Sequence, residues 1–167
     1  LMAGICLLGG ALTMTAVDRA NDVVAPTEAL HEQVVTDLAD VEAAVTGWEV
    51  SGAQSYQVDF DLARAELTAS LLALTEQADE LPVARAAVDA ESERIEVWLR
   101  AYAEPRLDLP GGAGSLDQVA FESGRGLLTE VAGAQSRTDD VLAAATTDAE
   151  SAAMLRFRTT IVAALLL

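Results

Sequence analysis

The residues that could carry out chemistry are few, and they lie far apart in the sequence. The only histidine is His31 and the only cysteine is Cys6. A nucleophilic triad needs a nucleophile held beside a base, but Cys6 lies in an uncharged, apolar stretch that does not include His31. We therefore predict no catalytic residues, and we expect His31 to be a surface residue.

Carboxylates are abundant, but their spacing does not indicate a metal site. The chain has 27 acidic residues, so neighbours such as Asp139-Asp140 are expected from abundance alone. There is no cluster of His and Cys for zinc, and the calcium-binding EF-hand spacing is missing. The glycine-rich segment 111–114 lacks the Lys-Ser/Thr that follows in a phosphate-binding loop. We expect no metal ion and no cofactor.

Arginine side chains are the candidates for contact with a ligand. Arg85, Arg94 and Arg100 fall in one helical stretch, and Arg125 lies where another helix should begin. Free backbone amides at such a beginning attract anions. We single out Arg85, Arg94 and Arg125 as possible ligand contacts, and pairing with nearby carboxylates is the alternative.

Charge is confined to the middle of the chain. Residues 1–17 and 159–167 carry no charged side chain, so the net charge of −17 belongs entirely to the region between them. Phosphate backbones are bound through Lys and Arg, and this region therefore disfavours a nucleic-acid partner.

The two uncharged ends are apolar. A bilayer-spanning helix needs about 20 apolar residues. We interpret residues 1–17 and 159–167 as two truncated transmembrane helices that flank a domain over residues 18–158. A signal peptide could explain the first apolar run but not the second. The acidic domain fits the outside of a bacterial cell membrane, although Arg158 beside the second span favours the opposite orientation.

Four helical stretches can be read between the apolar ends. The first follows Pro26 and stops at Ser51-Gly52, and the second covers residues 55–79. Apolar residues recur at spacings of three and four in both stretches, which is typical of one helix face. In the first they are Leu30, Val34, Leu38, Val41, Val45 and Trp48, and in the second Leu67, Leu71, Leu74 and Ala78.

The third stretch covers residues 82–104, and Pro105 should end it. Val88, Ile95 and Tyr102 lie seven apart in it. Glu91 and Ser92 interrupt this apolar stripe. Such a polar layer could be a ligand contact, a device that sets the register of the helices, or a partly exposed edge.

The fourth stretch should follow a loop at residues 109–115, a short helical piece at 116–121, and a break at residues 123–126. Small and polar residues such as Gln135 and Thr138 occupy its seam. Loose packing of this kind is compatible with a helix that shifts. An even number of long helices brings both ends of the chain to one face, so we predict an all-α, up-down-up-down four-helix bundle.

Several short segments resemble the third subtype of CHASE sensory domains. Residues 40–52 are similar to its signature D-x-E-T-G-Q-R-G-Y-L-L-T-G, although Ala43, Ala44, Thr46 and Glu49 depart from it. Residues 98–107 resemble the end of the family's third helix, and residues 123–126 its S-G-x-G turn. The residues that carry the resemblance are Asp40, Glu42, Gly47, Trp48, Gly52, Tyr56, Trp98, Pro105, Gly124 and Gly126.

The resemblance implies an extracytoplasmic, homodimeric sensory domain of a transmembrane receptor. The receptor would most often be a histidine kinase of a two-component system. It does not identify the stimulus, which could be a small molecule or a protein. A chemoreceptor, a diguanylate cyclase and a membrane-anchored structural protein remain alternatives.

Overall fold

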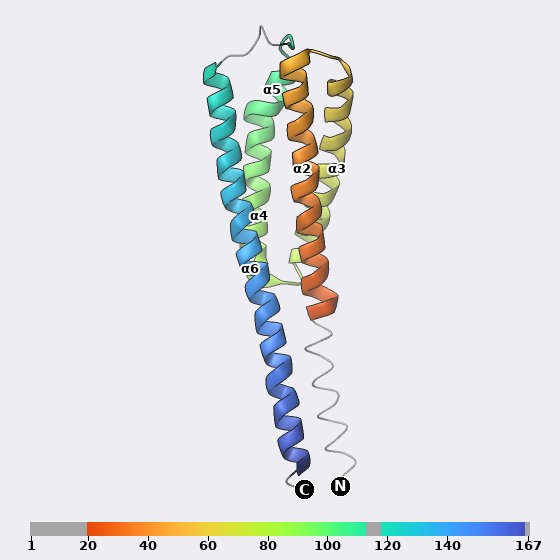
Figure 1. Cartoon of the computed structure of the whole chain (residues 1–167), viewed down its shortest axis with the longest axis vertical. Helices are drawn as coiled ribbons and strands as arrows, with labels where there is room; N and C mark the ends of the chain where they lie inside the picture. Colours follow the sequence, from red (N-terminus) through yellow and green to blue (C-terminus); the bar gives the residue numbers. More distant parts are fainter. Residues whose placement is uncertain (1–19, 113–117, 166–167) are drawn as a thin grey trace.

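The computed structural model describes residues 20–112 and 118–165, and this part of the chain is helical with no strand. Four long helices lie side by side and alternate in direction (Figure 1). They are α2 (Ala25–Ser51), α3 (Ser55–Ala78), α4 (Pro82–Trp98) and α6 (Gln118–Leu165). The start of α2 and the end of α6 lie toward the same end of the molecule. The predicted all-α arrangement is confirmed over these residues.

Two π-helical turns and a short helix complete the fold. η1 (Ala20–Val24) precedes α2, and α4 continues through η2 (Leu99–Ala103) into α5 (Glu104–Leu107). The prediction that Pro105 ends the third helix is therefore wrong. Pro105 lies in the first turn of α5, where its missing N–H is tolerated.

Helix α6 runs without interruption through the segment where we predicted a break. Residues 123–126 are helical, and the 48 residues of α6 correspond to about 72 Å at 1.5 Å per residue. Glycine lowers helix stability by only about 1 kcal/mol relative to alanine, so packing against the neighbouring helices can outweigh it. At its other end, α6 extends well past the turn between α3 and α4 (Figure 1).

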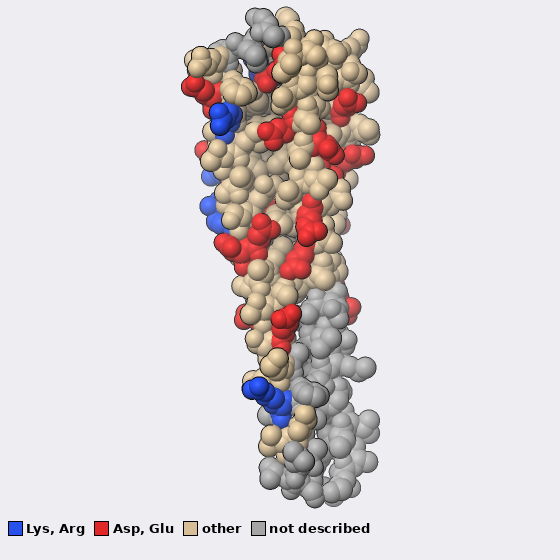
Figure 2. All heavy atoms as spheres, viewed as in Figure 1, with Lys and Arg blue, Asp and Glu red and all other residues tan. Residues whose placement is uncertain are grey.

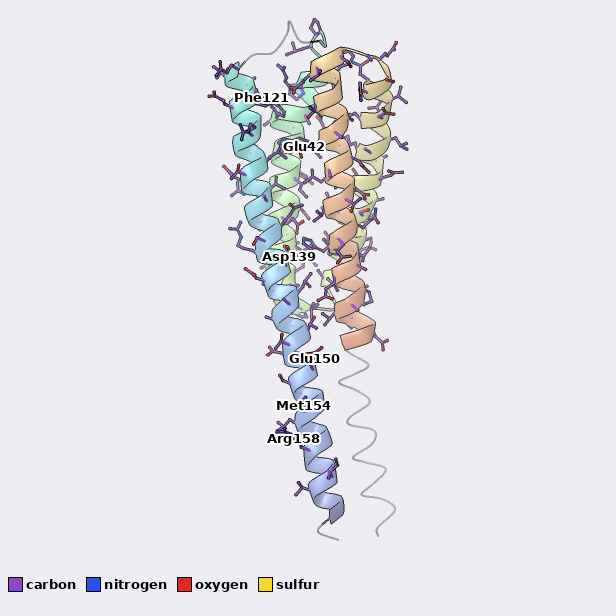
Figure 3. The ribbon with its side chains drawn as sticks, viewed as in Figure 1. Glu42, Phe121, Asp139, Glu150, Met154 and Arg158 are labelled. Carbon is purple, nitrogen blue, oxygen red and sulfur yellow. The ribbon has the colours of Figure 1, made fainter. Side chains whose placement is uncertain are left out.

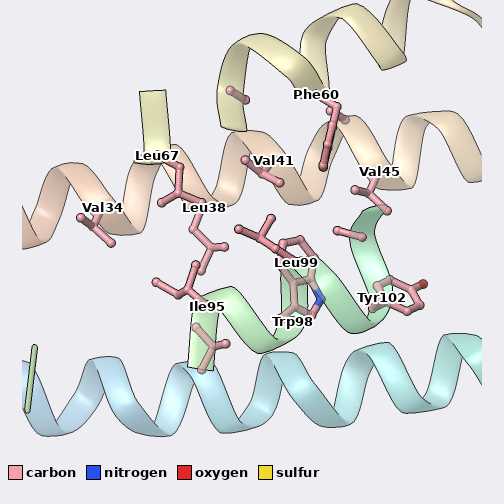
Figure 4. Packing of buried hydrophobic residues seen from close by; sticks show 14 of the residues in the cluster. Val34, Leu38, Val41, Val45, Phe60, Leu67, Ile95, Trp98, Leu99 and Tyr102 are labelled. Atoms are coloured by element: carbon pink, nitrogen blue, oxygen red, sulfur yellow. The ribbon is translucent and has the colours of Figure 1, made fainter. Parts of the chain in front are cut away.

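The main apolar core lies between the four helices (Figure 4), and a second, smaller cluster joins Val24, Leu81, Ala84 and Leu142. Leu67, Leu74, Ile95 and Trp98 are among the largest fully buried side chains of the main core. The stripes predicted for the first three helices supply most of this core. Members buried from those stripes are Val34, Leu38, Val41, Val45, Leu67, Leu74, Ala78, Val88, Ile95 and Tyr102.

The helices pack as two hairpins. α2 packs most extensively against α3, and α4 against α6, whereas the α3–α4 and α2–α6 interfaces are thinner. Each thin interface contains an open hollow, of about 440 Å³ between α3 and α4 and about 460 Å³ between α2 and α6. Packing is therefore denser within each hairpin than between the two hairpins.

Within the part of the chain that the structure describes, no helix has a segment both long and apolar enough to cross a bilayer. The predicted first span, residues 1–17, lies outside the described residues. The predicted second span, residues 159–167, lies only partly within them.

Candidate functional site

A buried histidine joins three helices in the middle of the bundle. His31 of α2 lies between Glu91 of α4 and Asp139 of α6, which Figure 3 labels partway along its helix. The Nδ1 atom of His31 is 3.2 Å from Oε2 of Glu91, and its Nε2 atom is 2.9 Å from Oδ1 of Asp139. These are close charge contacts rather than well-directed hydrogen bonds.

The expectation that His31 lies at the surface is wrong. Its exposed fraction is 2%, and that of Glu91 is 0%. His31 follows Thr27 by four residues and precedes Val34 by three, and both of these are also buried. This spacing places His31 on the inward face of α2. Its position in the apolar stripe was the sequence signal for burial.

The two carboxylates favour the charged form of His31. Burial by itself lowers the pKa of the imidazole, but its interactions with Glu91 and then Asp139 outweigh burial, so the pKa is raised above 6.5. An unpaired buried charge would be very costly. The Glu91 carboxylate, which is fully buried, is therefore the partner that makes a buried imidazolium acceptable.

The geometry suits a link between helices better than catalysis. The two carboxylates approach opposite ring nitrogens, so they do not converge on a common point. Over the described ranges, no group of three or more His, Cys, Asp and Glu side chains is arranged to hold a metal ion. What His31 can do is connect the α2–α3 hairpin to the α4–α6 hairpin, in a way that depends on its proton.

A second buried polar cluster lies nearer the end of the bundle that is distant from the termini. Glu49 of α2 accepts hydrogen bonds from the Tyr102 hydroxyl at 2.8 Å and from Nε of Arg106 at 2.6 Å. Burial and the neighbouring Glu49 raise the pKa of Tyr102 above its usual range. Because all three side chains are buried, this cluster fixes α2 against η2 and α5.

Backbone contacts close the bundle beyond this cluster. The Trp48 indole donates to the carbonyl of Arg106, and the Gly112 amide donates to the carbonyl of Trp48. Gly52 ends α2 with a φ of 66°, a left-handed conformation that glycine adopts without strain. A side chain at Gly52 would also collide with the backbone of Gly111. The distal end is therefore a tightly connected cap.

Most residues of the family-like motifs pack in or near this cap. Gly47 lies against the ring of Tyr56, and Gly124 against the ring of Tyr102, with no room for a side chain at either glycine. Trp98 is fully buried, while Asp40, Glu42, Pro105 and Gly126 are exposed. Asp40 and Tyr56 line one hollow between α2 and α3, whereas Gly47, Gly52, Trp98 and Gly124 have a packing role.

The arginines proposed as ligand contacts do not gather at one place. Arg85 pairs with Asp79 and Asp89, and Arg94 pairs with Glu130. The first two are nine residues apart on α4, which corresponds to about 13 Å. Arg125 lines the hollow between α2 and α6 together with Glu42. Arg85 and Arg94 therefore pair with carboxylates, which was the alternative to a ligand contact.

No protein-family model matches this chain, and no curated protein or solved structure is detectably similar to it.

Proposed function

We propose that this bundle is the extracytoplasmic sensory domain of a transmembrane receptor and that α6 relays its state toward the cell interior. The observation that carries the proposal is the continuity of α6. One uninterrupted helix starts beside the distal cap, passes the His31–Glu91–Asp139 link, and continues beyond the bundle. A rigid helix of this kind can transmit a displacement along its whole length.

The division into two hairpins supplies the movement that such a relay needs. Both hairpins share the apolar core, and polar contacts link them as well: His31 with Glu91 and Asp139, and Glu28 with the Thr146 hydroxyl at 2.7 Å. Polar contacts can exchange partners with water more readily than a tightly packed apolar core can deform. A stimulus that binds one arrangement more tightly would shift the population toward it, moving α6 relative to α2.

The membrane is part of the same proposal. Residues 1–17 and 159–167 would form the two spans, with residues 18–158 outside the cell as a homodimer. The start of α2 and the end of α6 lie toward the same end of the molecule, which supports two membrane crossings on that side. Acidic side chains are distributed over the bundle surface (Figure 2), which is compatible with an exposed extracellular domain.

The resemblance to CHASE domains makes a histidine kinase the first choice for the output module. Reading the gene beyond the codon for Leu167 tests this choice. A histidine-bearing dimerisation helix followed by an ATP-binding domain is the expected result. A methyl-accepting coil or a cyclase domain would keep the sensory role and change the output. A stop codon soon after the apolar segment would contradict the receptor role and leave a membrane-anchored structural protein.

A further inference from the structure

Helix α3 carries an apolar stripe on the side that faces away from the core. Val58, Leu62 and Leu72 are exposed to 66%, 61% and 60%. Ala65 and Ala69 are exposed between them. The five residues, which we call the α3 stripe, are spaced four, three, four and three apart, so they lie on one face of the helix.

The spacing of the α3 stripe matches the a and d positions of a heptad seam. In the same heptad, the buried residues Phe60, Leu67 and Leu74 occupy the f positions, which lie directly opposite the seam. The bundle therefore uses one face of α3 and leaves a second, coiled-coil-like face uncovered. An ordinary surface helix has polar residues there, and exposed apolar patches of this kind mark interaction sites.

Acidic side chains border the distal half of the stripe. Asp59, Asp61 and Glu66 are exposed and occupy the e and g positions beside Val58, Leu62 and Ala65. A hollow of about 280 Å³ opens at the same place, and its lining includes Asp40, Asp59, Leu62 and Glu66. These residues give the stripe a negative border.

Basic side chains do not offset this border. Arg64 is the only basic residue of α3. It is engaged with Glu104 at 2.6 Å on the side toward α5. The field beside the stripe therefore remains negative.

These charges argue against a second copy of the chain as the occupant. In a parallel pair of α3 helices, the g position of one chain faces the next e position of the other. Asp61 of one chain would then face Glu66 of the other, twice per dimer. In an antiparallel pair centred on the stripe, Glu66 would face its own copy. Like charges in such positions destabilise the pair.

We propose that the α3 stripe is the docking surface for a basic amphipathic helix of another protein. The apolar seam of that helix would cover Val58, Leu62 and Leu72, and Arg or Lys at its flanking positions would pair with Asp59, Asp61 and Glu66. The smaller Ala65 and Ala69 allow the two backbones to approach closely at the centre. This surface does not depend on the receptor role, since a structural protein could use it equally well.

The test uses two synthetic helical peptides of about three heptads, both with Leu at a and d. One has Arg at e and g, and the other has Glu. Their affinity for the full chain in phosphatidylcholine nanodiscs is measured by fluorescence anisotropy, with empty nanodiscs as the blank. The Arg peptide should bind at least about tenfold more tightly than the Glu peptide, a difference of about 1.4 kcal/mol.

Variants separate docking from simple charge attraction. The triple variant Val58→Ser, Leu62→Ser, Leu72→Ser keeps every charge and should weaken the Arg peptide at least about tenfold. The matched control Val50→Ser, Val83→Ser changes two exposed valines outside the stripe and should bind as the unaltered chain does. Circular dichroism verifies that all variants keep their helix content.

Four results would overturn the proposal. Equal binding of the Arg peptide to the triple variant would mean attraction by net charge alone. Equal affinities of the two peptides, or no binding of either, would remove the role of the acidic border. Conversion of a dimer into a monomer by the triple variant, measured by sedimentation, would show that a second copy covers the stripe.

Discussion

At the scale of single residues, the main feature is a histidine that is buried together with a carboxylate. His31 and Glu91 together occupy space that an apolar pair could fill, and apolar replacements of buried ion pairs are often as stable or more stable. Stability alone therefore gives no reason for this pair. A proton-dependent contact between the two hairpins does give one, because protonation of His31 changes the charge at their interface.

The first prediction concerns the dependence of stability on pH. The pKa of His31 is raised in the folded chain, so its stabilising contribution is fully present below its unfolded value of about 6.5. That contribution is lost as pH rises through the higher folded pKa. The free energy of unfolding, measured with denaturant, should therefore fall as the pH rises above about 6.5.

The control for this prediction is His31→Gln. All other titratable groups, Cys6 included, are present in both chains. The difference between the two chains therefore reports His31. Equal pH dependence of the unaltered chain and the variant would contradict the raised pKa.

The second prediction compares two glycines of one turn of α6. A methyl group at Gly124 would collide with the ring of Tyr102, whose hydroxyl donates to Glu49. Gly124→Ala should therefore cost about 1–3 kcal/mol of unfolding free energy. Nothing lies within 4 Å of a Cβ at Gly126, so Gly126→Ala should gain about 0.5–1 kcal/mol from helix propensity. Thermal unfolding measures both, and changes of the same sign would contradict the packing described for Gly124.

At the scale of the elements, α6 has to be stiff where it leaves the bundle. Thr146 of α6 donates a hydrogen bond to Glu28 of α2, and α6 continues past the start of α2 (Figure 1). Met154 and Arg158 lie in these outer turns (Figure 3). A displacement of α6 within the bundle would be carried along this helical segment.

The third prediction concerns a proline substitution that interrupts helix α6. Ala144 is exposed on α6, so its replacement by proline removes a backbone hydrogen bond without creating a cavity. Ala144→Pro should cost about 3 kcal/mol or more and should reduce hydrogen-exchange protection beyond residue 144. Ala144→Gly, which costs about 1 kcal/mol, is the matched control and should keep that protection. Similar protection in both variants would contradict a continuous, rigid α6.

The limits of sequence reasoning are visible in the same elements. Spacing of apolar residues predicted the four long helices, because helical periodicity follows directly from the pattern of burial. It failed at Pro105 and at residues 123–126, where local helix breakers are overruled by packing that involves distant residues such as Tyr102 and Glu49. It also failed at His31, since the partners that allow a histidine to be buried come from two other helices.

At the scale of the whole molecule, the two hairpins meet at thin interfaces and are joined by polar links at three levels. The Glu49–Tyr102–Arg106 cluster joins them near the distal cap, the His31–Glu91–Asp139 link joins them in the middle, and the Glu28–Thr146 hydrogen bond joins them nearer the termini. We expect the cap to act as the fixed point and the middle link to act as the switch. Release of the link should then move α6 relative to α2 most strongly toward the termini.

The movement of the two hairpins against each other is tested most directly by the distance between spin labels, which pulsed electron paramagnetic resonance measures. One pair, at the exposed positions Ala29 and Thr147, spans α2 and α6, and a second pair, at Ala86 and Ala143, lies within the α4–α6 hairpin. We predict that raising the pH stepwise from about 6 through the raised pKa of His31 changes the first distance and leaves the second unchanged. In His31→Gln neither distance should change. A first distance that does not respond to pH, or a response of equal size in the two pairs, would contradict the account of two hairpins that shift against each other.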